Sequence, residues 1–162
     1  MKHLFVVCVV ALLAMSACAP LDKTAENNMA AAQRFTEEIW NKGNLEAAGE
    51  ILADNFVRHN PASWQPPATE SRDAFKDYVA QIRSIYPDFH VQVNSRFASG
   101  DMVAASWTVT GTNKDLNKPI SLNGLSITRY AGGKAVEEWV AWDTHGLMQQ
   151  LGMVNPPEMS AK

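Results

Sequence analysis

Three side chains in this sequence are suited to proton transfer: Asp143, Glu138 and His59. Asp143 ends an apolar segment that contains Trp139 and Trp142, and apolar neighbours raise the pKa of a carboxyl group by desolvation. A histidine has an ordinary pKa of about 6.5 and exchanges protons near neutral pH. An Asp143–His59 pair across a pocket could therefore remove a proton next to a carbonyl group or activate a water molecule. The alternatives are that Asp143 caps the helix that follows it and that His59 bonds a loop carbonyl.

The alternation of side chains along a strand makes Glu138 a second candidate acid or base. Glu137 and Glu138 are adjacent, so a strand directs them to opposite faces. If Glu138 and Val140 point inward, Trp139 and Asp143 lie on the opposite face. Only a bulge or the end of the strand would then bring Asp143 inward.

Composition and spacing exclude several other kinds of site. The chain has 14 basic and 17 acidic residues, a balance that does not favour a nucleic-acid partner. His59, His90 and His145 lack the spacing of metal ligands, so we expect no metal. The sequence also has no Gly-x-Ser-x-Gly nucleophile motif and no phosphate-binding loop.

The first 17 residues have the pattern of a secretory signal, with Lys2 near the start, an apolar run over Leu4–Met15 and small residues after it. The apolar run is shorter than the roughly 20 residues that span a membrane. Met15-Ser16-Ala17-Cys18 resembles a bacterial lipobox, which implies cleavage before Cys18 and lipidation of that residue. The alternative is an ordinary signal cleavage near Ala17 or Ala19.

Lipidation of Cys18 would anchor the protein to a membrane. Ala19 after the lipidated position is consistent with sorting to the outer membrane. We therefore expect an exported protein that is lipid-anchored on the periplasmic face of the outer membrane. Cys8 would leave with the signal, so the folded domain would have no cysteine for a disulfide or a thiolate nucleophile.

Hydrophobic periodicity divides the remaining chain into a helical part and a strand part. Apolar residues first recur every three or four positions, with Ser71 as a predicted N-cap, and after Pro87 they alternate. The predicted helices are 25–41, 45–53, 71–86 and a short C-terminal helix within 144–152. The predicted strands are 89–97, 103–109, 120–130 and 137–143. Phe97 is in step with Phe89, Val91 and Val93.

This order of elements predicts an α+β domain in which helices cover one face of an antiparallel sheet. We expect the domain to span residues 25–152. A lipidated cysteine and tether at 18–24 would precede it, and a tail at 153–162 would follow it.

Five segments together resemble the SnoaL-like polyketide cyclases, also called ester cyclases. The segments are Trp40–Asn44, Phe56–Pro61, Tyr86–Asp88, Trp107–Thr112 and Glu137–Gly152. The resemblance implies the nuclear-transport-factor-two-like fold, in which a strongly curved antiparallel sheet forms a cone around three helices and a deep apolar pocket. It also implies chemistry that uses neither a metal nor an organic cofactor.

The cyclases of this family close a ring by intramolecular aldol condensation, with a carboxylate on the last strand and a histidine on the strand before it. Counting from the landmarks that this chain shares with the family places Val140 and Ser126 at those positions. Neither side chain can move a proton as the cyclase needs, which argues against polyketide ring closure.

The resemblance implies that Trp40 and Tyr78 line the pocket and that His59-Asn60 is the short polar motif at its wall. Core packing is the alternative for Trp40 and Tyr78. We also expect Trp107, Trp139 and Trp142 to line the pocket.

Two functions follow from these residues. The first is an enzyme that performs cyclisation, isomerisation or hydrolysis on a small apolar or aromatic molecule, favoured by His59 and Asp143. The second is a lipoprotein that binds such a molecule without changing it, favoured by Val140 and Ser126. The open sheet would also leave an apolar outer face, which predicts a homodimer through that face.

Overall fold

The computed structural model describes residues 23–154. The predicted signal peptide, Cys18 and most of the predicted tail lie outside the described residues. The helices are α2 (Lys23–Arg34), α3 (Ala48–Ile51), α4 (Arg72–Ile85) and α5 (Thr144–Leu151). The strands are β1 (Leu52–His59), β2 (Ala68–Thr69), β3 (His90–Ser99), β4 (Met102–Asn113), β5 (Lys118–Ala131) and β6 (Lys134–Trp142).

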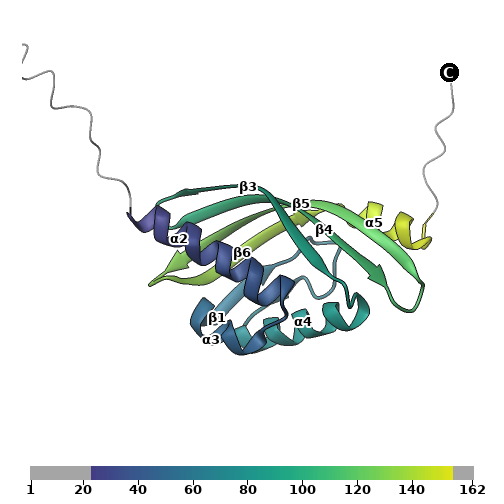
Figure 1. Ribbon diagram of the computed structural model, residues 1–162, viewed down its shortest axis with the longest axis horizontal. Coiled ribbons are helices and arrows are strands. Elements are labelled where there is room, and N and C mark those ends of the chain that lie inside the picture. Colours follow the sequence, from purple (N-terminus) through teal and green to yellow (C-terminus); the bar gives the residue numbers. More distant parts are fainter. Residues whose placement is uncertain (1–22, 155–162) are drawn as a thin grey trace, which may run out of the picture.

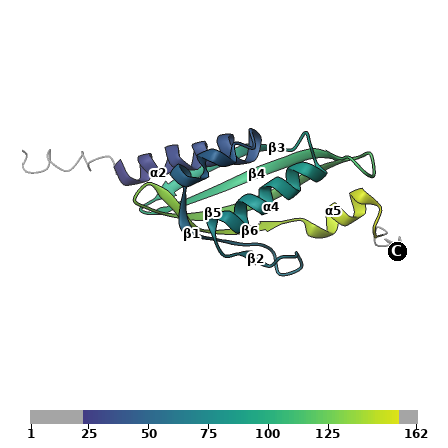
Figure 2. The same ribbon diagram turned by 90° about the horizontal axis from the view of Figure 1, so that it is seen from below.

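The six strands form one curved, open sheet in the order β2-β1-β6-β5-β4-β3. Strands β3 to β6 make the antiparallel meander expected from the alternating pattern. Helices α2, α3 and α4 lie on the concave side of the sheet, and α5 lies at the far end of β6 (Figures 1 and 2). The predicted α+β class is confirmed, but β1 pairs with β6 in parallel, so the sheet is mostly rather than wholly antiparallel.

Three phenylalanines join the helices to the sheet. Phe35, Phe56 and Phe75 come from the end of the first helical segment, from β1 and from α4, and all three are buried. Their rings meet edge to face, with centroid distances between 5.1 and 5.9 Å. Aromatic pairs of this geometry add to the stabilisation that burial gives. The cluster therefore fixes how the helices sit on the concave side.

The first two predicted helices differ from the structure. The first continues from α2 into a π-helical segment, Phe35–Asn41. The second is only a 3₁₀ turn, Leu45–Ala47, followed by the four residues of α3. Leu52 begins β1 because it pairs with Ala135 of β6, and both residues are fully buried. Pairing with a distant strand thus overrides the local helical spacing.

A β-bulge changes which side chains of β3 face inward. Val93 of β3 pairs with Trp107 of β4, and Ser95 pairs with the adjacent Ser106. β3 therefore has one extra residue between these two pairs. An extra residue reverses the faces of all residues after it. Phe97, expected in step with Val93, is therefore 67% exposed, and Arg96 faces the concave side.

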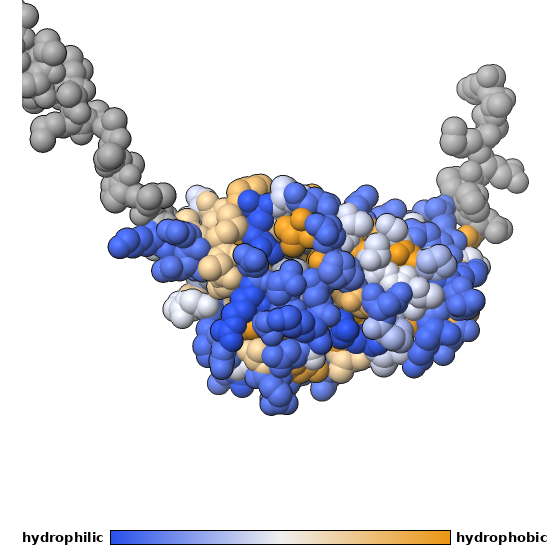
Figure 3. Space-filling model, viewed as in Figure 1, coloured by the Kyte–Doolittle hydropathy of each residue, from blue (hydrophilic) through white to orange (hydrophobic). Residues whose placement is uncertain are grey.

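On the face seen in Figure 3, hydrophilic side chains predominate and apolar residues form only small separate areas. Within residues 23–154, no helix has both the length and the apolar character that crossing a membrane requires.

The predicted helix over 71–86 is confirmed, with Ser71 as its N-cap accepting a hydrogen bond from the Ala74 N–H at 3.1 Å.

Asp88 connects the turn after α4 to the sheet. Its carboxylate accepts hydrogen bonds from the Thr112 backbone N–H at 2.6 Å and from the Thr112 hydroxyl at 2.8 Å. These bonds, the backbone one most, hold the pKa of Asp88 below its usual range. A carboxyl group with a depressed folded-state pKa contributes stability above its unfolded pKa of about 4, and that contribution is lost as the pH falls through the folded pKa.

We therefore expect Asp88→Asn to lower the melting temperature at neutral pH and to matter progressively less as the solution is acidified. Thermal melts of both proteins over a pH series measure this difference. Asp77→Asn, at an exposed position on α4, is the control and should change little. A melting-temperature gap between wild type and Asp88→Asn that stays constant at every pH would contradict the assignment.

Candidate functional site

A cavity with two connected compartments lies between the helices and the concave side of the sheet. The compartments enclose about 580 and 550 Å³, including the open solvent at their mouths. The residues shared by both compartments are Trp40, Arg58, Phe89, Trp107 and Val109. Because these residues line both parts, we treat the two as one cavity.

The polar floor of the first compartment is a buried ion pair. Arg58 of β1 and Glu138 of β6 are direct neighbours in the parallel pairing, and their side chains form a salt bridge with only 7% of each exposed. Thr128, the cross-strand partner of Glu138 on β5, donates a weaker hydrogen bond to it at 3.4 Å. Glu138 is therefore the inward-facing one of the two adjacent glutamates, which alternation alone had left open.

Arg58 is held from three directions. Its Nε donates to Asn60 Oδ1 at 3.2 Å, and Asn60 in turn donates to the Pro66 carbonyl at 2.9 Å. The guanidinium carbon lies 4.9 Å from the centroid of the Trp40 ring and 5.8 Å from that of Phe75. Cation–π contacts of this kind are stronger when desolvated. The pair is thus a fixed part of the cavity wall.

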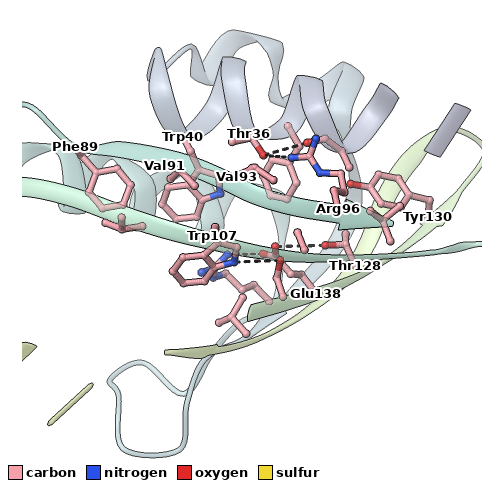
Figure 4. Close-up of a pocket in the computed structure, with 18 residues that line it drawn as sticks. Thr36, Trp40, Phe89, Val91, Val93, Arg96, Trp107, Thr128, Tyr130 and Glu138 are labelled. Carbon is pink, nitrogen blue, oxygen red and sulfur yellow. Dashed lines mark hydrogen bonds and ion pairs between the residues drawn. The ribbon is translucent and has the colours of Figure 1, made fainter. Parts of the chain in front are cut away.

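The opposite wall of the same compartment carries a second arginine and a tyrosine. Arg96 donates to the Thr36 hydroxyl at 2.9 Å, and Figure 4 shows Tyr130 beside Arg96, with Glu138 and Thr128 below. Burial lowers the pKa of the Arg96 guanidinium from its usual value. Burial, followed by the charge of Glu138, raises the pKa of the Tyr130 hydroxyl well above its usual range. Both shifts reflect burial, which is nearly complete for Tyr130 and partial for Arg96.

The second compartment is almost wholly apolar. Trp64 and Trp142 meet edge to face at 4.8 Å, and Ile120, Leu122 and Leu147 complete much of the wall. This end of the cavity suits an aromatic or aliphatic group.

Trp107 stands where the two compartments meet. Its ring lies over Gly124, where a Cβ atom would come within 2.1 Å of it, so glycine is required there. Its Nε1 donates to Ser126 Oγ at 3.3 Å.

Asp143 caps helix α5, which was the alternative to a role in the pocket. Its Oδ1 accepts a hydrogen bond from the Gly146 N–H at 2.7 Å at the start of α5. The residue is exposed and is not among the cavity-lining residues. The expected contact with His59 is not present, since His59 has a different partner.

His59 lies on the convex side of the sheet. Its Nε2 is 2.9 Å from Glu137 Oε1, and its ring stacks on Trp139 at 5.4 Å. Glu137 also accepts from Arg129 at 2.9 Å. Arg129 first, and His59 second, lower the pKa of Glu137. The cluster is separate from the cavity because Glu137 and Glu138 point to opposite faces.

Of the six residues predicted to line the pocket, four line the cavity, and Trp139 and Asn60 do not. Trp40, Tyr78, Trp107 and Trp142 line one or both compartments. Trp139 is 39% exposed on the convex side because it alternates with Glu138. Asn60 is buried but lies behind Arg58 and positions it.

The convex side has an apolar row that crosses the sheet. Trp139 pairs with Ile127, Ile127 with Ala104 and Ala104 with Phe97. Phe97, Ile127 and Trp139 are 67%, 46% and 39% exposed. This row is the face through which the sequence predicts a homodimer, and the homodimer stays a prediction.

The positions that correspond to the cyclase acid–base pair are next to the ion pair. Ser126 and Val140 lie directly opposite each other on β5 and β6, and both line the first compartment. The neighbouring inward pair on the same two strands is Thr128 and Glu138. A carboxylate is therefore present on the expected strand and face, two residues before the position where counting placed it.

Arg58, Arg96, Thr128 and Tyr130 were not identified from sequence. Arg58 shares the face of Phe56 by simple alternation, so its inward position could have been found. Arg96 could not, because its orientation depends on the bulge in β3. Among the described residues, no group of three or more His, Cys, Asp or Glu side chains could hold a metal ion.

We expect Glu138→Gln to lower the free energy of unfolding by about 3 kcal/mol, because it leaves the Arg58 charge buried without a partner. Glu137→Gln, one residue away on the convex side, is the matched control and should cost far less, since exposed ion pairs contribute little. Urea denaturation of the two variants measures both effects. Equal losses would mean that the Arg58–Glu138 pair is not effectively buried.

Comparisons with known proteins agree with this geometry. The sequence profile of the SnoaL-like polyketide cyclase family matches residues 30–151. A candidate polyketide cyclase from Bacillus cereus ATCC 10987 is 30% identical, with a TM-score of 0.68 over 79% of this chain and 82% of that one. A candidate SnoaL-like polyketide cyclase from Jannaschia sp. CCS1 has the same fold at 17% identity, with a TM-score of 0.74 over 86% of this chain and 100% of that one.

A candidate polyketide cyclase from Acidithiobacillus ferrooxidans is 25% identical, with a TM-score of 0.68 over 86% of this chain and 99% of that one. A comparison with functionally curated proteins found no significant match. The profile match covers most of the chain, and the fold agrees along its length. The chain belongs to the SnoaL-like polyketide cyclase family, with the nuclear-transport-factor-two-like fold.

Proposed function

We propose that the cavity binds a small apolar or aromatic molecule and that Glu138 acts on it as a cofactor-independent acid or base. The observation that carries this proposal is a carboxylate, 5% exposed, in the wall of a cavity lined mainly by aromatic and aliphatic side chains. A buried carboxylate is costly to keep. Its presence there favours a chemical role over a purely structural one.

The arrangement around Glu138 suits removal of a proton next to a carbonyl group. A carboxylate has about four lone-pair positions, and Arg58 and Thr128 use two of them. A lone pair therefore remains for a substrate proton. The Arg58 guanidinium neutralises the carboxylate and would stabilise a negative charge that develops on the substrate oxygen. Cyclisation and isomerisation both begin with such a step.

A second candidate function is binding without chemical change. Val140 and Ser126 occupy the positions of the cyclase acid–base pair, and both carboxylate oxygens of Glu138 already have partners. A pocket of this kind also suits a carrier or sensor.

We expect the wild-type protein to convert a bound molecule that Glu138→Gln binds but leaves unchanged. Native mass spectrometry of the protein incubated with an extract of the host would identify the molecule. Glu137→Gln is the control and should behave as wild type, because Glu137 lies on the convex side. Asp143→Asn should also retain activity, since Asp143 caps α5.

The outcomes separate the two functions. Conversion that is lost only in Glu138→Gln establishes an enzyme and its acid–base residue. A molecule bound unaltered by all four proteins indicates a binding protein without catalytic activity. Conversion that survives in Glu138→Gln but not in Asp143→Asn would mean that Asp143 is the acid or base, and it would overturn the assignment of that role to Glu138.

We further propose that the domain is exported and held on the periplasmic face of the outer membrane by lipid on Cys18. The apolar run Leu4–Met15, the lipobox-like Met15–Cys18 and Ala19 support this location. Substitution of Cys18 by Ser should release the protein from the membrane fraction.

A further inference from the structure

The charges inside the cavity do not balance. Its lining contains three charged side chains: Arg58, Glu138 and Arg96. Arg58 and Glu138 neutralise each other in their salt bridge. Within residues 23–154, Arg96 has no carboxylate within ion-pair distance. The exposed Glu37 lines a separate surface hollow together with Arg96 and acts on it only at longer range. The cavity therefore carries one uncompensated positive charge.

Arg96 and Tyr130 both have unused hydrogen-bonding capacity that faces this cavity. A guanidinium group has five N–H donors, and Arg96 uses one of them on Thr36 in the described part of the chain. The Tyr130 hydroxyl belongs to a residue that is only 2% exposed. It makes no hydrogen bond of normal geometry to the described residues, although the Thr128 side chain lies beside it. A buried donor without a partner is costly and calls for a ligand atom.

We infer that Arg96 and Tyr130 bind a carboxylate group of the ligand, so that the ligand class is a small aromatic or apolar carboxylic acid. A planar guanidinium fork fits a carboxylate in two-point contact, and the Tyr130 hydroxyl supplies a further donor. One excess positive charge is matched by a monoanion such as a carboxylate rather than by a dianionic phosphate ester.

The rest of the cavity agrees with this ligand class. Beside the polar wall lie Trp40, Phe89 and Trp107 (Figure 4). Beyond them is the apolar compartment around Trp64 and Trp142. The ring or chain of the acid would occupy that compartment. This inference rests on the proposed function, because it assumes that the cavity is the ligand site. Its new element is the negative charge of the ligand.

The test measures the binding of three naphthalene probes to the full chain by isothermal titration calorimetry at neutral pH. The probes are 2-naphthoate, the neutral 2-naphthalenemethanol and the dianionic 2-naphthyl phosphate. We expect 2-naphthoate to bind at least about tenfold more tightly than the alcohol, as charge-assisted hydrogen bonds imply. We also expect it to bind more tightly than the phosphate.

Two variants assign the preference to its residues. Arg96→Gln should remove the preference for 2-naphthoate over the alcohol while the affinity for the alcohol changes little. Tyr130→Phe, which keeps the buried ring, should reduce the preference several-fold. Arg129→Gln is the matched control, because Arg129 pairs with Glu137 on the convex side, and it should retain the full preference. Thermal melting shows whether each variant is folded. If Arg96→Gln does not fold, Tyr130→Phe still tests the inference.

The failures are distinguishable. If the alcohol binds as tightly as 2-naphthoate, or if the phosphate binds most tightly, the carboxylate assignment is overturned and the cavity is still a ligand site. A preference that survives unchanged in both Arg96→Gln and Tyr130→Phe also overturns it. If no probe binds to the wild-type protein, the proposed function itself fails for aromatic ligands, and this inference fails with it.

Discussion

The buried Arg58–Glu138 ion pair is the interaction on which the site depends. It joins two strands that are distant in sequence and parallel in space, and its partners reach from the loop at Asn60 to the ring of Trp40. Loss of one member would leave the other charged and buried, which is why such pairs are costly to break. The same geometry that makes the pair a structural constraint also presents its carboxylate to the cavity.

The second constraint is the bulge in β3. One extra residue between Val93 and Ser95 reverses the inward and outward faces of the strand. It moves Phe97 to the convex side and Arg96 to the cavity, so a single local irregularity adds a positive charge to an otherwise neutral pocket. The site thus differs in two ways from the pattern that the resemblance implied: a carboxylate lies two residues earlier on β6, and a second arginine lines the same compartment.

The carboxylate and histidine expected to act together lie in different environments. Asp143 is bound to the backbone at the start of α5, whereas His59 stacks on Trp139 on the convex side. Residue type alone could not separate Glu137 from Glu138. The strand alternation placed them on opposite faces, and the structure decided that Glu138 is the inward one. The expectation that Trp139 lines the pocket conflicted with the alternation that puts Glu138 and Val140 inward. The alternation was right, because one face of the sheet is buried and the pleat is regular there.

The sequence by itself determined the α+β class, the meander after Pro87, helix α4 with its Ser71 cap and the family, because these depend on local periodicity, capping and motif order. It also determined that Glu137 and Glu138 point to opposite faces, but not which of them faces inward. Only the tertiary structure decided that Leu52 starts a strand, that β1 is parallel to β6 and that Arg96 enters the cavity. Those features arise from pairing between distant strands, whose register and bulges are set by packing and leave no periodic signal in the chain.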